Sequence, residues 1–140
     1  MTPLYTAEAL STGAGRNGHV RTTSGMVALD LAIPKEMGGS GNGANPEELF
    51  AAGYAACFHS ALQLVARKHK AAIADTSVGS RVSLLPNDQG GFILAVTLEV
   101  AIPEIARDQA QALVDAAHQV CPYSNATRGN IEVTLTLVDD

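Results

Sequence analysis

Residues 45–70 read NPEELFAAGYAACFHSALQLVARKHK, and this stretch decides the fold because it predicts one long helix. Residues 45–48, Asn-Pro-Glu-Glu, carry the start signals: an N-cap, a proline for the first helical position and two acids for the positive end of the dipole. The second acid follows the cap at capping-box spacing. From 49 to 66 the stretch is apolar nearly all round, which is typical of a helix at the centre of a protein or an interface.

Five segments outside this helix have the composition or the two-residue alternation of β-strands. A second helix is predicted to open at Pro103-Glu104 and to stop at Pro122. The order strand–strand–helix–strand–strand–helix–strand predicts an α+β fold in one domain spanning residues 1–140. The strands are expected at 4–10, 26–33, 78–85, 91–102 and 131–138, with turns at 11–18 and 86–90 and a glycine-rich connector at 38–43.

The composition and charge of the chain argue against several classes of function. The chain has 140 residues, is 46% hydrophobic and carries a net charge of −5, which favours a globular domain and argues against a nucleic-acid surface. The N-terminus lacks the basic and apolar regions of a signal peptide, and the longest apolar run, 49–58, is far shorter than a membrane span. We therefore expect a cytoplasmic protein with no membrane partner, whose thiols are mostly reduced.

The chain has two cysteines, Cys57 inside the long helix and Cys121 near the end of the second one. Neither belongs to a CxxC motif, so a zinc ribbon or thioredoxin-type site is not indicated. The pair suits one thiol that attacks and a second that resolves the product, although a buried cysteine can equally be a small apolar packing residue. His59 lies about 200° from Cys57 around the helix, which excludes a local Cys–His pair.

Other candidate residues have simpler interpretations. A zinc site built from Cys57, His59, His118 and Cys121 matches no standard ligand spacing, and we predict no metal. His118 by default is a surface histidine near a helix end. The glycine-rich connector lacks the Gly-Lys-Ser/Thr of a phosphate loop and is followed by two glutamates, so it is interpreted as flexible.

Three segments carry a resemblance to a known family. Residues 45–58 resemble the peroxidatic-cysteine segment of the organic hydroperoxide resistance proteins (Ohr), and residues 120–130, VCPYSNATRGN, resemble their resolving-cysteine segment. Residues 15–18, GRNG, resemble the N-terminal arginine loop of that family. The match spans essentially the whole chain, and the tail YSNATRGN resembles Ohr more than the sister OsmC proteins.

The resemblance implies an α+β fold with antiparallel-rich sheets, intertwined as a homodimer around two central helices. It also implies a thiol peroxidase that reduces organic hydroperoxides, has no bound cofactor and is recycled by lipoyl dithiols such as dihydrolipoamide. Cys57 would be the peroxidatic residue and Cys121 the resolving one. Arg16 and Glu47 would be the supporting pair, with Arg21 as the fallback for the arginine.

Helix geometry adds a constraint, because Glu47 and Cys57 are ten residues apart, or about 15 Å of helical rise. We therefore predict that the site is completed across a dimer interface or that the chain bends between them. The apolar helix also predicts an apolar pocket, which favours alkyl or lipid hydroperoxides. Three alternatives stay open: an OsmC-type peroxidase of broader range, a non-catalytic carrier of hydrophobic ligands, and a cysteine hydrolase with His118 as its base.

Overall fold

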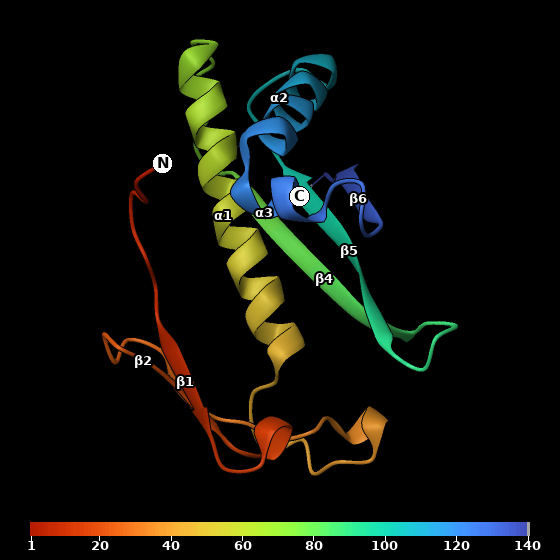
Figure 1. Ribbon diagram of the computed structural model, residues 1–140. Coiled ribbons are helices and arrows are strands. Elements are labelled where there is room, and N and C mark those ends of the chain that lie inside the picture. Colours follow the sequence, from red (N-terminus) through yellow and green to blue (C-terminus); the bar gives the residue numbers. More distant parts are fainter. Residues whose placement is uncertain (140) are drawn as a thin grey trace. The chain divides into compact units, whose positions relative to one another are not determined.

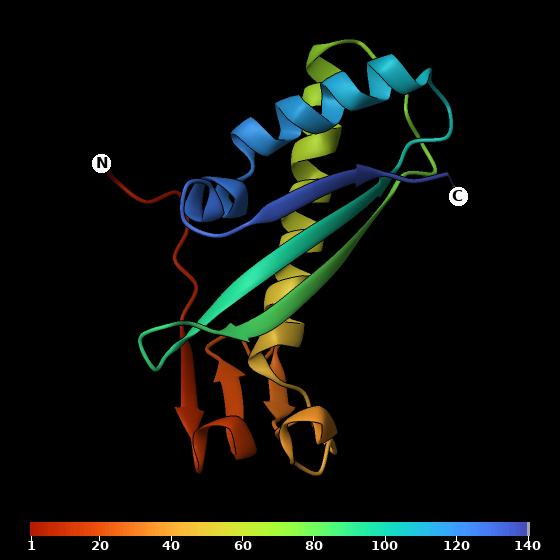
Figure 2. The same ribbon diagram turned by 90° about the vertical axis from the view of Figure 1, so that its right-hand side faces the viewer.

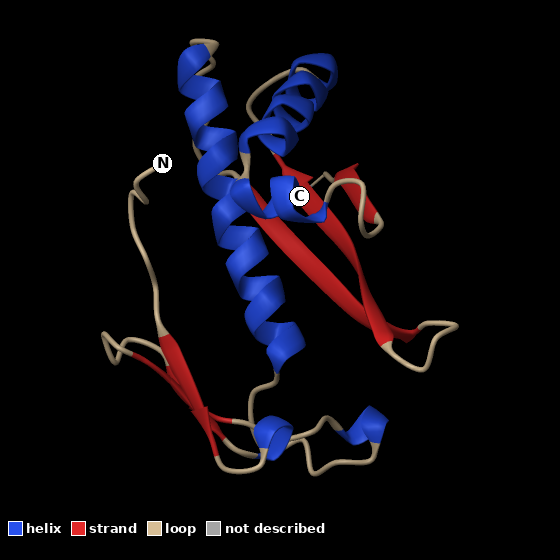
Figure 3. Cartoon of the chain, in the orientation of Figure 1, coloured by secondary structure: helices blue, strands red, loops and turns tan. Residues whose placement is uncertain are grey.

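The computed structural model describes residues 1–139, which form two compact units, Met1–Leu49 and the chain from Phe50 onward (Figure 1). Helix α1 (Pro46–Lys68) begins in the first unit and continues into the second. Both units contain strands and helical turns, as Figure 3 shows, so the predicted α+β class is confirmed. The single domain over residues 1–140 stays a prediction, and its last residue lies outside the described residues.

The first unit contains a three-stranded antiparallel sheet in the order β1-β2-β3, with β1 at Ala9–Thr12, β2 at His19–Thr22 and β3 at Ala28–Asp30. One short 3-10 turn, Gly15–Asn17, lies between β1 and β2, and a second, Lys35–Met37, follows β3. The strand expected at 4–10 is therefore placed too early, the strand expected at 26–33 is too long, and β2 is missed. Strands of three or four residues are too short for alternation to reveal them.

The turn between β1 and β2 requires glycine residues, because backbone segments pack closely there. A Cβ atom at Gly18 would lie 2.2 Å from the carbonyl oxygen of Thr12, and Gly15 has a φ of +62° that other residues rarely adopt. These glycines let the chain reverse in a small space and present the Gly15–Asn17 turn. The turn predicted at 11–18 is confirmed for residues 13–18, whereas residues 11 and 12 belong to β1.

The second unit has one sheet and three helical segments (Figure 2). β4 (Ser77–Pro86) and β5 (Phe92–Ala101) form the predicted hairpin, and β6 (Val133–Leu137) lies parallel to β5. Helix α1 crosses one face of this sheet in both views. Helix α2 (Arg107–Val120) is followed at once by the short helix α3 (Pro122–Thr127).

Two helix boundaries differ from those predicted, and the short helix α3 was not predicted. Helix α2 begins at Arg107 rather than at Pro103-Glu104, and the Glu104 carboxylate accepts a hydrogen bond from the backbone N–H of Ala74. Pro122 ends α2 but also opens α3, since proline fits a first helical position. Helix α1 ends at Lys68 rather than at residue 70, where Lys70 adopts a left-handed conformation.

The core of the second unit forms between α1, α2 and β5. Tyr54, Phe58 and Leu62 follow one another at four-residue spacing on α1 and are fully buried. They pack in one cluster with Leu98 of β5 and Ala117 of α2. By length and composition alone, helix α1 is long and apolar enough to cross a membrane, but the core helix of a soluble protein passes the same test. Of its most apolar 18-residue segment, 33% is buried within the described chain.

Candidate active site

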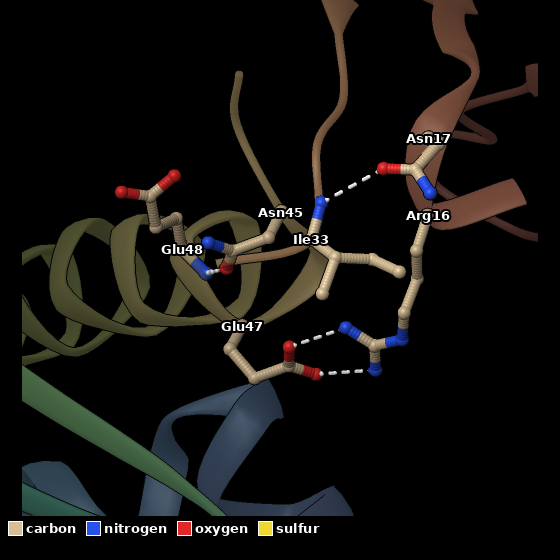
Figure 4. A network of polar contacts seen from close by, with 6 residues as sticks. All are labelled: Arg16, Asn17, Ile33, Asn45, Glu47 and Glu48. Atoms are coloured by element: carbon tan, nitrogen blue, oxygen red, sulfur yellow. Dashed lines mark hydrogen bonds and ion pairs between the residues drawn. The ribbon is translucent and has the colours of Figure 1, made fainter. Parts of the chain in front are cut away.

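The first unit contains a two-bond ion pair between Arg16 and Glu47 (Figure 4). Nη1 of Arg16 donates to Oε1 of Glu47 at 2.7 Å, and Nη2 donates to Oε2 at 3.0 Å. These hydrogen bonds from Arg16 hold the pKa of Glu47 below its usual range and raise that of the guanidinium. The glutamate side chain is 18% exposed and the arginine 34%, so the pair has a fixed geometry that is still open to solvent.

Two asparagines anchor the segments that carry this pair. Oδ1 of Asn17 accepts a hydrogen bond from the backbone of Ile33 at 3.1 Å, which ties the Arg16 turn to the strand-end segment. Oδ1 of Asn45 accepts from the backbone of Glu48 at 2.8 Å, which confirms the predicted N-cap of α1. The arginine turn and the helix start are therefore each fixed by a side-chain-to-backbone bond.

The second unit contains both cysteines, and they are not joined by a disulfide. Cys57 lies half-buried on α1, whereas Cys121 is fully buried at the junction of α2 and α3. Burial raises the pKa of the Cys57 thiol, and the neighbouring Cys121 thiol raises it further. The backbone N–H of Tyr123 acts in the opposite direction and lowers the pKa of Cys57. Cys121 belongs to the core cluster of this unit, and Cys57 packs against that cluster.

An aromatic cluster packs beside the two thiols. The ring of Tyr123 lies 6.0 Å from that of Phe50 and 5.5 Å from that of Tyr54, measured between centroids. The Tyr123 hydroxyl reaches α1 at Gly53, where a Cβ atom would lie only 2.6 Å from the hydroxyl oxygen. Gly53, one turn before Cys57, therefore allows the Cys121–Tyr123 segment to approach the helix that carries Cys57.

A buried polar network lies next to this cluster, and the sequence did not indicate it. The Tyr54 hydroxyl is 2.8 Å from Oγ of Ser124 and 3.1 Å from Oγ1 of Thr127, and Nδ1 of His118 is 2.8 Å from the same Ser124 oxygen. His118 is thus half-buried and bonded rather than free at the surface. Its pKa is lowered by burial and by the positive charge of Arg128, with Asp115 opposing them.

The remaining candidates lie apart from this arrangement. Nε2 of His59 is 2.8 Å from the Thr76 hydroxyl, and no cluster of three or more His, Cys, Asp or Glu side chains that could hold a metal occurs among residues 1–139. Arg21, the fallback arginine, lies exposed on β2. Helix α1 is unbroken between Glu47 and Cys57, so the alternative of a chain bend is wrong, and completion across a dimer stays a prediction.

Comparisons with known proteins identify the family. Residues 39–136 match the model of the OsmC-like protein family. The chain is 50% identical over 138 residues to the organic hydroperoxide resistance protein of Xanthomonas axonopodis pv. citri, with 96% of this chain and 94% of that protein covered. The chain belongs to the Ohr/OsmC family.

Solved structures of Ohr proteins have the same fold. An organic hydroperoxide resistance protein from Legionella pneumophila aligns with a TM-score of 0.94 at 52% identity, covering 97% of this chain and 98% of that one. One from Elizabethkingia anophelis aligns with a TM-score of 0.94 at 50% identity over the full length of both chains. These matches confirm the Ohr resemblance and the fold class drawn from the sequence.

Proposed function

We propose that this Ohr/OsmC protein is a thiol peroxidase that reduces organic hydroperoxides to alcohols, with Cys57 as the peroxidatic and Cys121 as the resolving cysteine. The observation that carries the proposal is that both cysteines, one half-buried and one fully buried, pack in the same core of a single compact unit. The relatives named for organic hydroperoxide resistance support the same substrate class.

The first step is attack of the Cys57 thiolate on the distal oxygen of the hydroperoxide. A sulfur–oxygen bond forms, the oxygen–oxygen bond breaks, and the leaving alkoxide takes up a proton to become the alcohol. Cys57 is left as a sulfenic acid. The half-buried position of Cys57 lets a small hydroperoxide reach the sulfur while most bulk water is kept away.

The second step joins the two cysteines. The Cys121 sulfur attacks the sulfenic acid of Cys57, a disulfide forms and water leaves. An external dithiol, which we propose to be a dihydrolipoyl group, then reduces this disulfide by two exchange reactions and is itself oxidised to the cyclic disulfide. Because Cys121 is fully buried, the incoming dithiol is expected to attack the sulfur of Cys57 first.

The Arg16–Glu47 pair would supply what Cys57 lacks in its own unit. A thiol with an ordinary pKa of about 8.5 is roughly 3% ionised at pH 7, so full ionisation gains only about 30-fold. Burial and Cys121 raise the pKa of Cys57, so a cation is needed to favour the thiolate. A guanidinium held by two hydrogen bonds can stabilise both the thiolate and the departing alkoxide.

A homodimer would bring the two parts of the site together. Glu47 and Cys57 are separated by about 15 Å of helical rise on α1, so Arg16 of one protomer would serve Cys57 of the other. The proposal is supported by the apolar helix α1, of which 33% of the apolar window is buried within the described chain. We also propose a cytoplasmic location, where reduced thiols and lipoyl dithiols coexist.

The experiment is turnover of tert-butyl hydroperoxide with dihydrolipoamide as the reductant, comparing the wild type with Cys57→Ser and Cys121→Ser. The proposal expects turnover by the wild type, no reaction by Cys57→Ser, and a single round followed by a stall for Cys121→Ser. If all three proteins were equally inactive, the proposed function would be contradicted, because the cysteines would then be packing residues.

One observation favours a second candidate, a carrier of hydrophobic ligands. An open groove of about 450 Å³ in the second unit is lined mainly by apolar side chains, including Phe50, Phe92, Ile93, Leu94 and Ile131. A carrier would bind a fluorescent fatty acid equally well before and after Cys57→Ser. Loss of hydroperoxide reduction with unchanged fatty-acid binding in that variant would separate the two functions.

A further inference from the structure

Three buried hydroxyls and one imidazole connect the helices that carry the two cysteines. Tyr54 lies on α1 three residues before Cys57, and Ser124 lies on α3 three residues after Cys121. Their oxygens are 2.8 Å apart, and both side chains are fully buried. The link therefore joins the two helices one turn away from each sulfur.

The hydroxyls form one connected chain of hydrogen bonds. Oγ1 of Thr127 lies 3.1 Å from the Tyr54 hydroxyl and 3.2 Å from the carbonyl oxygen of Ser124, to which it can donate its proton. The Tyr54 hydroxyl lies 2.8 Å from Oγ of Ser124, and each of these hydroxyls can serve as donor or acceptor.

Nδ1 of His118 is 2.8 Å from the same Ser124 oxygen, and it donates to that oxygen or accepts from it according to the tautomer of the ring. The backbone carbonyl of the same histidine accepts from Nη1 of Arg128 at 2.9 Å, and Arg128 also contacts Asn125. Helix α3 is consequently fastened to α1 through Ser124 and Thr127, and its C-cap Arg128 is fastened to the last turn of α2.

We propose that Tyr54, Ser124 and His118 are positioning residues for disulfide formation, which hold the Cys121 sulfur in line with the oxidised Cys57. This inference rests on the proposed two-cysteine peroxidase function. A disulfide needs Cα atoms about 4.4–6.8 Å apart and a narrow range of side-chain directions. A six-residue helix such as α3 is too short to hold its place by its own hydrogen bonds, so the network fixes it.

Loss of the network should slow the resolving step and leave the rate of the peroxide step unchanged. Cys57 is carried by the long helix α1, which the core holds in place without these hydroxyls. When Cys121 is displaced, the Cys57 sulfenic acid persists, and a second hydroperoxide converts it to the sulfinic acid with release of a second alcohol. Weakening the network should therefore raise sulfinic acid formation at a given hydroperoxide concentration.

The test is a single-turnover experiment on Tyr54→Phe, with Tyr5→Phe as the matched control because Tyr5 is exposed and lies in the other unit. Tyr54→Phe should consume the first equivalent of tert-butyl hydroperoxide at the wild-type rate. Its disulfide should form roughly fivefold or more slowly, as expected for the loss of one net hydrogen bond. Its yield of Cys57 sulfinic acid, measured by mass spectrometry, should rise with hydroperoxide concentration.

A second pair of variants keeps the test decisive if Tyr54→Phe does not fold. His118→Leu removes the hydrogen-bond partner of Ser124 and should slow disulfide formation, whereas His118→Asn retains a polar side chain that can bond to Ser124 and should restore most of it. Disulfide formation at the wild-type rate in both Tyr54→Phe and His118→Leu would overturn the inference.

The outcomes also separate this inference from the proposed function. A wild type that never reduces hydroperoxide contradicts the peroxidase itself. A wild type that forms the disulfide normally, together with a Tyr54→Phe protein that does so equally fast, contradicts only the positioning role.

Discussion

The guanidinium of Arg16 donates two hydrogen bonds to the carboxylate of Glu47, at 2.7 and 3.0 Å, across 31 positions of sequence. One partner comes from a 3-10 turn and the other from the first turn of α1. The pair fixes the direction of the guanidinium, and a fixed cation can stabilise a thiolate without reorganising during the reaction.

Removal of the Glu47 charge should therefore slow the peroxide step. Glu47→Gln keeps the shape of the side chain but loses the charge-assisted hydrogen bonds, so Arg16 becomes free to turn away. We expect the second-order rate with tert-butyl hydroperoxide to fall roughly tenfold or more. Glu48→Gln is the control, because Glu48 is the exposed neighbour. Equal rates in the two variants would contradict a role for the pair.

The same pair should make stability depend on pH. The pKa of Glu47 is lowered in the folded protein, so its contribution to stability is present above the unfolded pKa of about 4.3 and is lost as pH falls through the folded value. The free energy of unfolding of Glu47→Gln should thus lie below that of the wild type at pH 7. The difference should shrink at pH 3, as denaturant unfolding at both pH values would measure. A difference that grows towards pH 3 would contradict a lowered pKa of Glu47 in the folded protein.

Gly53 is required by the hydroxyl of Tyr123. Gly53→Ala would normally stabilise an exposed helix position by about 1 kcal/mol, but here the new methyl group would meet the Tyr123 oxygen. We expect a lower thermal midpoint for Gly53→Ala and partial recovery in the double variant Gly53→Ala/Tyr123→Phe, in which the hydroxyl is gone but the ring carbon Cζ still lies 3.1 Å from the new methyl group. A double-mutant cycle with the single Tyr123→Phe protein measures this coupling. Additive changes would show that the two residues do not meet.

The two thiols should differ in their accessibility to reagents. Cys57 is half-buried and Cys121 has no exposed surface, so iodoacetamide should modify Cys57 first in the reduced protein. Modification of Cys121 should follow only as the chain opens, and mild denaturant should speed it selectively. Peptide mapping after a short reaction provides the measurement, and equal labelling of both residues would show that Cys121 is not buried in solution.

Local signals in the sequence predict the long helix and the hairpin. The cap at Asn45 and Pro46 marks the start of α1, and the turn at residues 86–90 joins two strands whose alternation is long enough to recognise. The short strand β2 and the helix α3 were missed because they hold four and six residues. Neither is long enough to show its own period.

The polar contacts of the site could not be derived from spacing. Arg16 and Glu47 were selected by the family resemblance, since neither residue has a local pattern that indicates the other. The link between Tyr54 and Ser124 joins positions 70 apart, and it depends on how α1, α2 and α3 pack. Buried hydroxyls of this kind look like ordinary packing residues until the fold brings them together.

The most direct test of the account is the covalent state of the protein after one equivalent of tert-butyl hydroperoxide. The mass of the wild type should fall by two hydrogens, and its digest should contain two peptides joined by a disulfide between Cys57 and Cys121. Cys121→Ser should gain a single oxygen on Cys57. An unchanged mass in the wild type, or an oxygen found on Cys121 while Cys57 stays reduced, would contradict the central claim.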